Sequence, residues 1–302
     1  MNYKKIIKNR GTRQKILSLL SFIPDKPMVE LQYLMKIRHR LNLKAPERYT
    51  EKLQWYKLYY RDPLMAQCVD KYEVRKYVEK KGLGNILNEC YGIYDRVEDI
   101  DFDSLPAQFV MKKTNGSGGL NVIICKDKTQ LDIVDTKKIL NDWLMPYSAD
   151  TGGREWAYYG LKNRIVIEKY LENEEDTEAG ISDYKFFCFN GRVTHLAVDV
   201  DRFIGHKRNF YDGEWNYLDV SSDCPSFGDH ISKPEGFSTL VATAETLAED
   251  FPCVRTDLYL LAGKVIFGEL TFYPWSGYVR FSPDSFDYEL GAEFGLPEKR
   301  CK

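Results

Sequence analysis

The pattern of apolar and polar positions divides the chain into a helical first third and a remainder rich in strands. Apolar residues recur at helical spacing up to about residue 81, whereas after residue 106 the apolar runs are short and rich in β-branched side chains. The pattern predicts helices over residues 1–23, 29–41, from residue 50 onward, 70–81, 129–144 and 239–250. It predicts strands over residues 108–113, 121–125, 164–171, 184–189, 192–200, 254–260 and 265–272.

Turn residues punctuate this pattern. Asn190-Gly191 separates two predicted strands by two residues, which is typical of a tight hairpin. Gly82 follows the helix predicted over residues 70–81, where a left-handed residue commonly ends a helix. The remainder of the chain therefore reads mainly as antiparallel hairpins.

Composition narrows the class of protein. The chain has 302 residues, 43% of them apolar and 29% charged, which is typical of a globular protein and excludes collagen, coiled coil and disorder. The longest apolar run, about residues 16–23, is far short of the roughly 20 residues that cross a bilayer. Pro24-Asp25 follows it in place of a signal-peptide cleavage site. Seven scattered cysteines without a CxxC pair indicate a reducing cytosol and neither a disulfide framework nor a zinc site.

Charge is distributed unevenly along the chain. Residues 1–61 carry 15 Lys and Arg against 4 Asp and Glu, whereas the rest carries 28 against 41. The basic head either meets an anionic partner or packs against the acidic body. Residues 1–23 hold six basic side chains and no acid, so a helix there could lie on an anionic membrane. Nucleic acid is not expected as a partner, because the body is acidic and has no base-reading module.

A glycine-rich loop is the first candidate for chemistry. Gly116, Ser117, Gly118 and Gly119 lie between two predicted strands, so the loop is neither a P-loop nor a dinucleotide fingerprint. Its glycines would let backbone N–H groups approach phosphates, with Lys112 neutralising their charge. The alternative is a flexible turn without a ligand.

The end of the strand over residues 164–171 is the second candidate. Glu168 and the backbone of Lys169, Tyr170 and Leu171 offer the acceptor and donor groups that an adenine needs. Glu175 follows seven residues after Glu168 and could accept hydrogen bonds from a ribose. The alternative is an acidic, solvated loop.

The last predicted hairpin is the third candidate. A three-residue loop over residues 261–263, with Gly263 left-handed, would place Asp257 and Glu269 on one face, whereas a two-residue turn would place them on opposite faces. Two adjacent carboxylates repel unless a cation lies between them, and Mg²⁺ prefers such oxygen ligands. The alternative is a surface salt bridge from Arg255 to Glu269.

Lys112, the glycine-rich loop, Glu168, Lys185, Arg255, Asp257 and Glu269 occur in an order that resembles the ATP-grasp superfamily. Over roughly residues 40–290 the chain is similar to its TupA-like branch, which is associated with bacterial teichuronopeptide and capsular polysaccharide synthesis. The resembling segments are TEKLQW at 50–55, DKY at 70–72, FVMK at 109–112, GSGG at 116–119, DYKFF at 183–187, DRF at 201–203, HKRNFYD at 206–212, RTDLY at 255–259 and GELTFYP at 268–274.

The resemblance implies a role for each motif residue. Lys71, Lys112 and Lys185 would bind the phosphates of ATP, and Glu168 with the backbone at Lys169 and Leu171 would bind adenine. Glu175 would bind the ribose, and Asp257 and Glu269 would bind the magnesium ion. Arg255 would stabilise charge on the transferring group. Thr271 stands where ATP-grasp ligases often carry a metal-binding Asn, which makes a second metal ion doubtful.

The resemblance also implies a fold and an activity. We expect an α+β ATP-grasp fold, with two subdomains gripping ATP and a helical N-terminal extension, divided at residues 1–60, 61–106, 107–170 and 171–302. We expect a cytoplasmic ATP- and Mg²⁺-dependent ligase that joins a carboxylate to an amine through an acyl-phosphate, in bacterial cell-surface polysaccharide biosynthesis. A peripheral place at the inner face of the membrane stays open.

Two other readings stay open as well. Asp199-Val200-Asp201 is a DxD motif, which some glycosyltransferases use for a metal and a sugar nucleotide, and a phosphotransferase of the same pathway is a related possibility. A nucleotide-binding module without turnover is the second. Arg202, Lys207 and Arg208, with His206, form a candidate site for phosphate or an acidic substrate, the alternative being a solvated basic turn.

Overall fold

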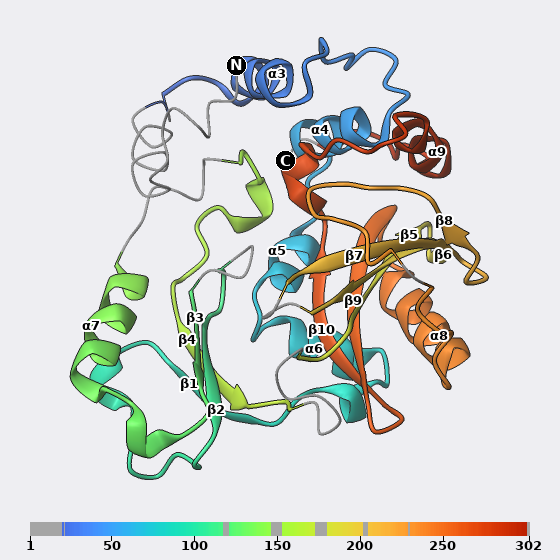
Figure 1. Ribbon diagram of the computed structural model, residues 1–302. Helices are drawn as coiled ribbons and strands as arrows, with labels where there is room; N and C mark the ends of the chain where they lie inside the picture. The colour runs from blue at the N-terminus through green and yellow to red at the C-terminus, as the bar shows by residue number, and fades with distance from the viewer. Residues whose placement is uncertain are drawn as a thin grey trace.

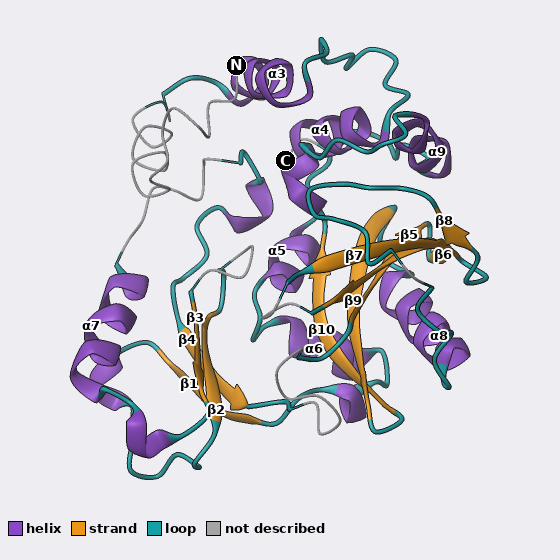
Figure 2. Cartoon of the chain, viewed as in Figure 1, coloured by secondary structure: helices purple, strands orange, loops and turns teal. Residues whose placement is uncertain are grey.

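The computed structural model describes residues 20, 22–116, 121–145, 153–172, 180–201, 205–228 and 230–300. The described residues form two antiparallel sheets, one of four strands and one of six, with helices around and between them (Figures 1 and 2). The helix predicted over residues 1–23 lies outside the described residues except for its last few positions.

Helices precede both sheets, as the apolar pattern predicts. They are α3 (Asp25–Ile37), α4 (Tyr49–Tyr59), α5 (Pro63–Val69) and α6 (Val74–Lys80). The helix predicted from residue 70 begins only at Val74, because the Asp70 carboxylate accepts hydrogen bonds from the N–H groups of Tyr72 and Glu73 and holds a turn there. Gly82 follows with a φ of 75°, the left-handed conformation expected at a helix end.

The smaller sheet has the strand order β1-β4-β2-β3. Its strands are β1 (Cys90–Tyr94), β2 (Phe109–Lys113), β3 (Val122–Cys125) and β4 (Ile165–Lys169). Helix α7 (Ile133–Leu144) covers one face and joins the core of this sheet through Leu140 and Trp143. The pattern missed β1, a half-buried edge strand that lacks clean alternation.

The larger sheet has the order β10-β9-β5-β6-β7-β8. Its strands are β5 (Asp183–Phe189), β6 (Arg192–Val200), β7 (Lys207–Asp212), β8 (Tyr217–Leu218), β9 (Cys253–Leu261) and β10 (Lys264–Thr271). Helix α8 (Phe237–Ala248) packs on one face, where Phe237 contacts Phe186. Helices α4 and α9 (Ser285–Glu293) pack at one end of the other face, where Tyr49 contacts Phe187.

Short helical turns complete the fold. They are η1 (Gly84–Ile86), η2 (Val97–Asp99), η3 (Lys128–Gln130), η5 (Trp156–Tyr158) and η6 (Pro274–Gly277). The segment from α5 to α6 links the two sheets: the Lys71 N–H donates to the Thr114 carbonyl after β2 (2.8 Å), and the Tyr77 hydroxyl donates to the Leu247 carbonyl in α8 (3.0 Å). Within the described ranges, every helix is too short or too polar to cross a bilayer.

Candidate functional site

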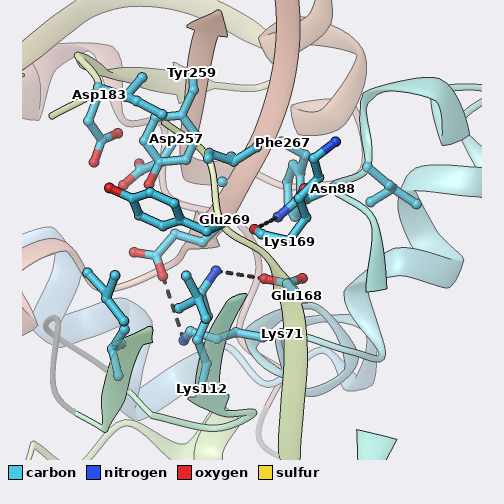
Figure 3. A pocket seen from close by; sticks show the side chains of 18 of the residues that line it. Lys71, Asn88, Lys112, Glu168, Lys169, Asp183, Asp257, Tyr259, Phe267 and Glu269 are labelled. Atoms are coloured by element: carbon cyan, nitrogen blue, oxygen red, sulfur yellow. Dashed lines mark hydrogen bonds and ion pairs between the residues drawn. The ribbon is translucent and has the colours of Figure 1, made fainter. Parts of the chain in front are cut away.

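A cavity of about 470 Å³ lies between the two sheets. Side chains from both sheets and from the linking segment face it, as Figure 3 shows. The sequence-predicted residues that line it are Lys71, Lys112, Gly116, Glu168, Lys169, Tyr170, Leu171, Lys185, Asp257 and Glu269. Residues far apart in the chain are therefore brought to one place, although Ser117, Gly118, Gly119, Glu175 and Arg202 lie outside the described residues.

The smaller sheet contributes an ion pair to the cavity. Lys112 pairs with Val166 and Val110 pairs with Glu168 across β2 and β4, so Lys112 and Glu168 are diagonal neighbours on one face. The Lys112 ammonium lies 2.6 Å from a Glu168 carboxylate oxygen, and Arg75 lies 3.7 Å from the other oxygen. Glu168 is thus held by two cations at the end of a buried strand.

The backbone after Glu168 is partly committed to the fold. The Lys169 N–H donates to the Glu89 carbonyl (2.9 Å), and the Lys169 carbonyl accepts from the Asn88 side-chain amide (2.8 Å). A base bound here would therefore find its free backbone partners mainly at Tyr170 and Leu171, which also line the cavity. Sequence reasoning missed Asn88, because a single polar residue in a loop gives no pattern.

Lys71 lies between the sheets. Its ammonium donates to the Gly116 carbonyl in the glycine-rich loop and lies 3.9 Å from Glu269 on β10. Burial lowers the pKa of Lys71, because removing the ammonium from water disfavours its charge. A lysine in this position can neutralise an anion from the side opposite the larger sheet.

The larger sheet contributes a buried row of alternating charges. Lys185 on β5 is paired directly with Asp257 on β9, and its ammonium lies 2.8 Å from that carboxylate and also contacts Asp183. The Arg255 guanidinium forms two hydrogen bonds of 2.7 Å to Asp257. Burial alone would raise the pKa of Asp257, but Arg255 and Lys185 hold that pKa below its usual range. Burial likewise opposes the charge of Lys185, but its carboxylate partners raise its pKa.

The hairpin that carries the two carboxylates differs from the prediction. The loop between β9 and β10 has two residues, Ala262 and Gly263, with φ of 48° and 72°, and the predicted three-residue loop is wrong. A β-bulge at Gly268 inserts one extra residue into β10, so Glu269 lies directly opposite Asp257. The two carboxylates therefore share one face, as predicted, through the bulge and not through the loop.

Gly268 permits this bulge because it has no Cβ. A Cβ there would lie 2.7 Å from the carbonyl oxygen of Asp257, which is closer than carbon and oxygen approach.

Of the two carboxylates, that of Glu269 is the more accessible to a magnesium ion that would take its other ligands from phosphate and water. Both oxygens of Asp257 already accept hydrogen bonds, whereas Glu269 is 44% exposed and its nearest cations are 3.8 and 3.9 Å away. The Thr271 hydroxyl donates to Glu269 (3.3 Å), so in this structure it orients that carboxylate. Among the described residues, no group of three or more His, Cys, Asp or Glu side chains could hold a metal. Mg²⁺ suits such a site, because it is commonly bound through one or two carboxylates and substrate phosphates.

Of the basic cluster after β6, the described members His206, Lys207 and Arg208 do not line the cavity. Arg208 is buried and binds both oxygens of Asp199, and it also lies 2.6 Å from Asp223. Lys207 is half-buried and lies 4.0 Å from Asp201. Asp199 is therefore committed to a buried ion pair, which argues against the DxD reading of residues 199–201.

A left-handed turn after β10 is a feature that the sequence did not reveal. Trp275 and Ser276 have φ of 50° and 56°, a costly conformation for residues with a Cβ. The Trp275 indole N–H donates to Asp223 (2.9 Å), and its ring lies 5.7 Å from the Arg255 guanidinium. The ammonium of buried Lys57 supports the turn by donating to the Ser276 carbonyl (2.7 Å).

This arrangement of two α+β subdomains around one charged cavity is that of an ATP-grasp protein, which confirms the predicted fold class. A family model described as TupA-like ATPgrasp matches residues 51–295, and the chain belongs to that family. The family expected from the sequence motifs is thereby confirmed.

Several solved structures are similar to this chain at low sequence identity. D-alanine–D-alanine ligase from Bacillus anthracis is 17% identical, with 76% of this chain and 67% of that chain covered and a TM-score of 0.46. The same enzyme from Helicobacter pylori is 15% identical, with 76% of this chain and 61% of that chain covered and a TM-score of 0.43. N5-carboxyaminoimidazole ribonucleotide synthetase from Thermus thermophilus is 10% identical, with 71% of this chain and 48% of that chain covered and a TM-score of 0.40. The chain thus spans from about half to two thirds of these structures, and no curated protein sequence matches it.

Proposed function

We propose that the chain is an ATP- and Mg²⁺-dependent ligase of the carboxylate–amine type. The observation that carries the proposal is the set of charges around the cavity: three lysines, Lys71, Lys112 and Lys185, line it together with the carboxylates of Asp257 and Glu269. Cations beside a pair of carboxylates suit a nucleoside triphosphate bound together with a divalent cation. Membership of the TupA-like family supports the same assignment.

The residues divide the work by position. Lys112 and Lys71 would neutralise phosphate oxygens from the side of the smaller sheet, where Lys71 already contacts the glycine-rich loop at Gly116. Glu269, the more accessible of the two carboxylates, would be the principal protein ligand of the metal. The bound Mg²⁺ would supply charge neutralisation on the phosphates.

The proposed reaction requires no side-chain nucleophile. The substrate carboxylate attacks the terminal phosphorus of ATP and releases ADP, and an amine then displaces phosphate from the acyl-phosphate. Arg255 and Thr271 do not line the cavity. Arg255, held by its two bonds to Asp257 and 3.8 Å from Glu269, would stabilise negative charge on the transferring group from behind these carboxylates. Catalysis would thus consist of positioning and electrostatic stabilisation.

The proposed setting is the biosynthesis or modification of a bacterial cell-surface polysaccharide. It is supported by the TupA-like resemblance and not by a feature of the cavity. The acid and the amine would then belong to polysaccharide precursors.

The test is a screen of carboxylates and amines for release of ADP and phosphate. We expect release that requires Mg²⁺ and both substrates, and that is lost in Glu269→Gln. Lys264→Gln is a matched control, because Lys264 is exposed at the hairpin tip of the same strand and does not line the cavity.

Two results would replace the proposal. Protection from thermal unfolding by a sugar nucleotide, with none from Mg-ATP, would favour a glycosyltransferase. Binding of Mg-ATP without turnover across all substrates would favour a nucleotide-binding module.

A further inference from the structure

Helix α3 is apolar on two sides. Its inner side buries Met28, Val29, Tyr33 and Ile37, and the Tyr33 hydroxyl forms a 2.9 Å hydrogen bond with Thr50 of α4. Its outer side carries Leu31, Leu34 and Met35, each 47–50% exposed. The inner side packs the helix against the rest of the protein, whereas the outer side leaves apolar side chains exposed.

The outer residues form one continuous stripe. Positions 31, 34 and 35 stand three and four residues apart, so their side chains are neighbours on the helix surface. Phe22, just before the helix, is 80% exposed. An apolar stripe on the outer side of a helix is normally covered by a partner, and α3 lies at the outer edge of the molecule, on the far side of α4 from the larger sheet (Figure 1). We call Leu31, Leu34 and Met35 the outer stripe.

Exposed basic residues lie near the outer stripe along the chain. Between residues 22 and 45 the exposed charged side chains are Lys26, Arg38, Arg40 and Lys44, with Glu30 as the exposed acid. The partner of this surface must therefore offer both negative charge and an apolar interior.

We infer that the outer stripe and its basic border dock this protein on an anionic lipid bilayer. The apolar side chains would enter the boundary between headgroups and acyl chains, with α3 lying in the plane of the surface. The flanking basic residues would be attracted to anionic headgroups. The inference does not depend on the reaction proposed above.

Contacts from α3 to the body would hold the rest of the protein at the surface. The Arg154 guanidinium donates to Asp25 at the start of α3 (2.9 Å), and Arg61 lies 3.8 Å from the same carboxylate. Arg154 is itself buried. Docking of α3 would thus carry the body with it.

A second copy of the chain fits this surface less well. Two outer stripes facing each other would bring their basic borders together, and like charges across an interface oppose association. An anionic bilayer satisfies the apolar and the basic residues at once.

The experiment is cosedimentation of the full chain with vesicles of phosphatidylcholine alone or mixed with phosphatidylglycerol. The wild type should bind only the anionic vesicles, and high salt should weaken binding. Leu31→Ser/Leu34→Ser/Met35→Ser should lower the partition coefficient by about tenfold or more, because three apolar side chains no longer enter the boundary. Arg38→Glu/Arg40→Glu should lower it as well and should reduce its salt dependence. Val134→Ser is the matched control, because Val134 is 82% exposed on α7 and should leave binding unchanged.

Three outcomes would overturn the inference. The first is a wild type that ignores anionic vesicles at low salt, and the second is a triple variant that binds them as the wild type does. The third is a wild-type dimer without lipid that becomes monomeric in the triple variant, which would assign the stripe to a second copy. Thermal unfolding and Mg-ATP binding of each variant should match the wild type, so failure here and failure of the proposed function are distinguishable.

Discussion

The two sheets bring charge to the same cavity in different ways. On the smaller sheet, Lys112 is 30% exposed and forms a single close ion pair with Glu168. On the larger sheet, Asp257 is 1% exposed and is bound by Lys185 and Arg255 at once. One side of the cavity thus holds a pair whose lysine is partly exposed and whose glutamate is buried, and the other side holds a fully buried network.

This difference separates residues expected to act mainly in ligand binding from residues that also stabilise the fold. A partly exposed ion pair contributes little to stability, so its members can turn to a ligand at small cost. A buried network cannot lose one member without leaving an uncompensated charge in the interior. Substitutions on the smaller sheet should therefore change ligand affinity, whereas substitutions in the buried network should also change the stability of the fold.

The largest expected effect is that of Asp257→Asn. The substitution leaves Lys185 and Arg255 without their shared carboxylate, and we expect the free energy of unfolding to fall by about 3 kcal/mol or more. Chemical denaturation measures it. Glu269→Gln is the matched comparison on the neighbouring strand and should stay within about 1 kcal/mol of the wild type, because Glu269 is partly exposed. Equal stability of the two variants would remove the distinction between accessible and buried charge.

Two buried lysines sharpen the comparison within the larger subdomain. Carboxylates raise the pKa of Lys185, whereas Lys57 donates to the neutral oxygens of Ser276 and Gly153, and burial lowers its pKa to about 7. Between that value and the ordinary 10.5, the unfolded chain binds a proton that the folded chain has released. The stability contributed by this site therefore rises with pH across that window and is lowest below it.

Lys57→Met tests this difference. Unfolding measured from pH 7.5 to 9.5 should show a wild-type stability that rises relative to the variant, by at most about 1.4 kcal/mol per pH unit. Parallel pH profiles would mean that Lys57 does not titrate in this range.

Gly268→Ala tests the bulge that aligns the two carboxylates. The added Cβ would meet the Asp257 carbonyl at 2.7 Å, so the strand must shift or the bulge must move, at a cost of about 1–3 kcal/mol. Turnover should fall as well, because Glu269 would no longer lie opposite Asp257. Gly263→Ala, at the hairpin tip with open space around it, is a control that strains the backbone without moving Glu269. Activity retained in Gly268→Ala would show that this alignment is not needed.

The same hairpin shows how far the sequence alone reaches. The alternation of polar and apolar residues correctly predicts that Asp257 and Glu269 share a face. The predicted loop is wrong because a two-residue loop with one bulged residue brings the same side chains to one face as a three-residue loop without a bulge. The alternation depends only on the total number of inserted residues and cannot tell the two apart. The turn at Asn190-Gly191 is predicted fully, since both residues need positive φ and the sequence places Asn and Gly there.

Long-range pairing is the part that local patterns cannot supply. The resemblance points to the order of the site residues, but not to the two bonds that tie Arg255 to Asp257 or to the contact of Lys71 with Gly116. The segment TEKLQW is recognisable as a motif, yet its polar side chains act at a distance, since Gln54 donates to the Gly277 carbonyl (2.8 Å) and Lys52 to the Gly291 carbonyl (2.7 Å). Such roles depend on which helices meet, which is a property of the whole fold.

The smallest expected effect on stability is that of Lys112→Ala. The ammonium of Lys112 is partly exposed and has one close partner, so the free energy of unfolding should change by less than about 1 kcal/mol. Mg-ATP affinity should fall nevertheless, because the variant removes a cation from the wall of the cavity. Calorimetric titration with Mg-ATP and chemical denaturation of the same preparation measure the two quantities.

Lys128→Ala is the control for Lys112, because Lys128 belongs to the same subdomain but does not line the cavity. Its substitution should leave Mg-ATP affinity unchanged. Unchanged affinity in Lys112→Ala would remove this lysine from the phosphate site. A loss of stability as large as that of Asp257→Asn would show that the Lys112–Glu168 pair supports the fold as the buried network does. Such a loss arises when removal of one partner leaves an uncompensated charge in the interior.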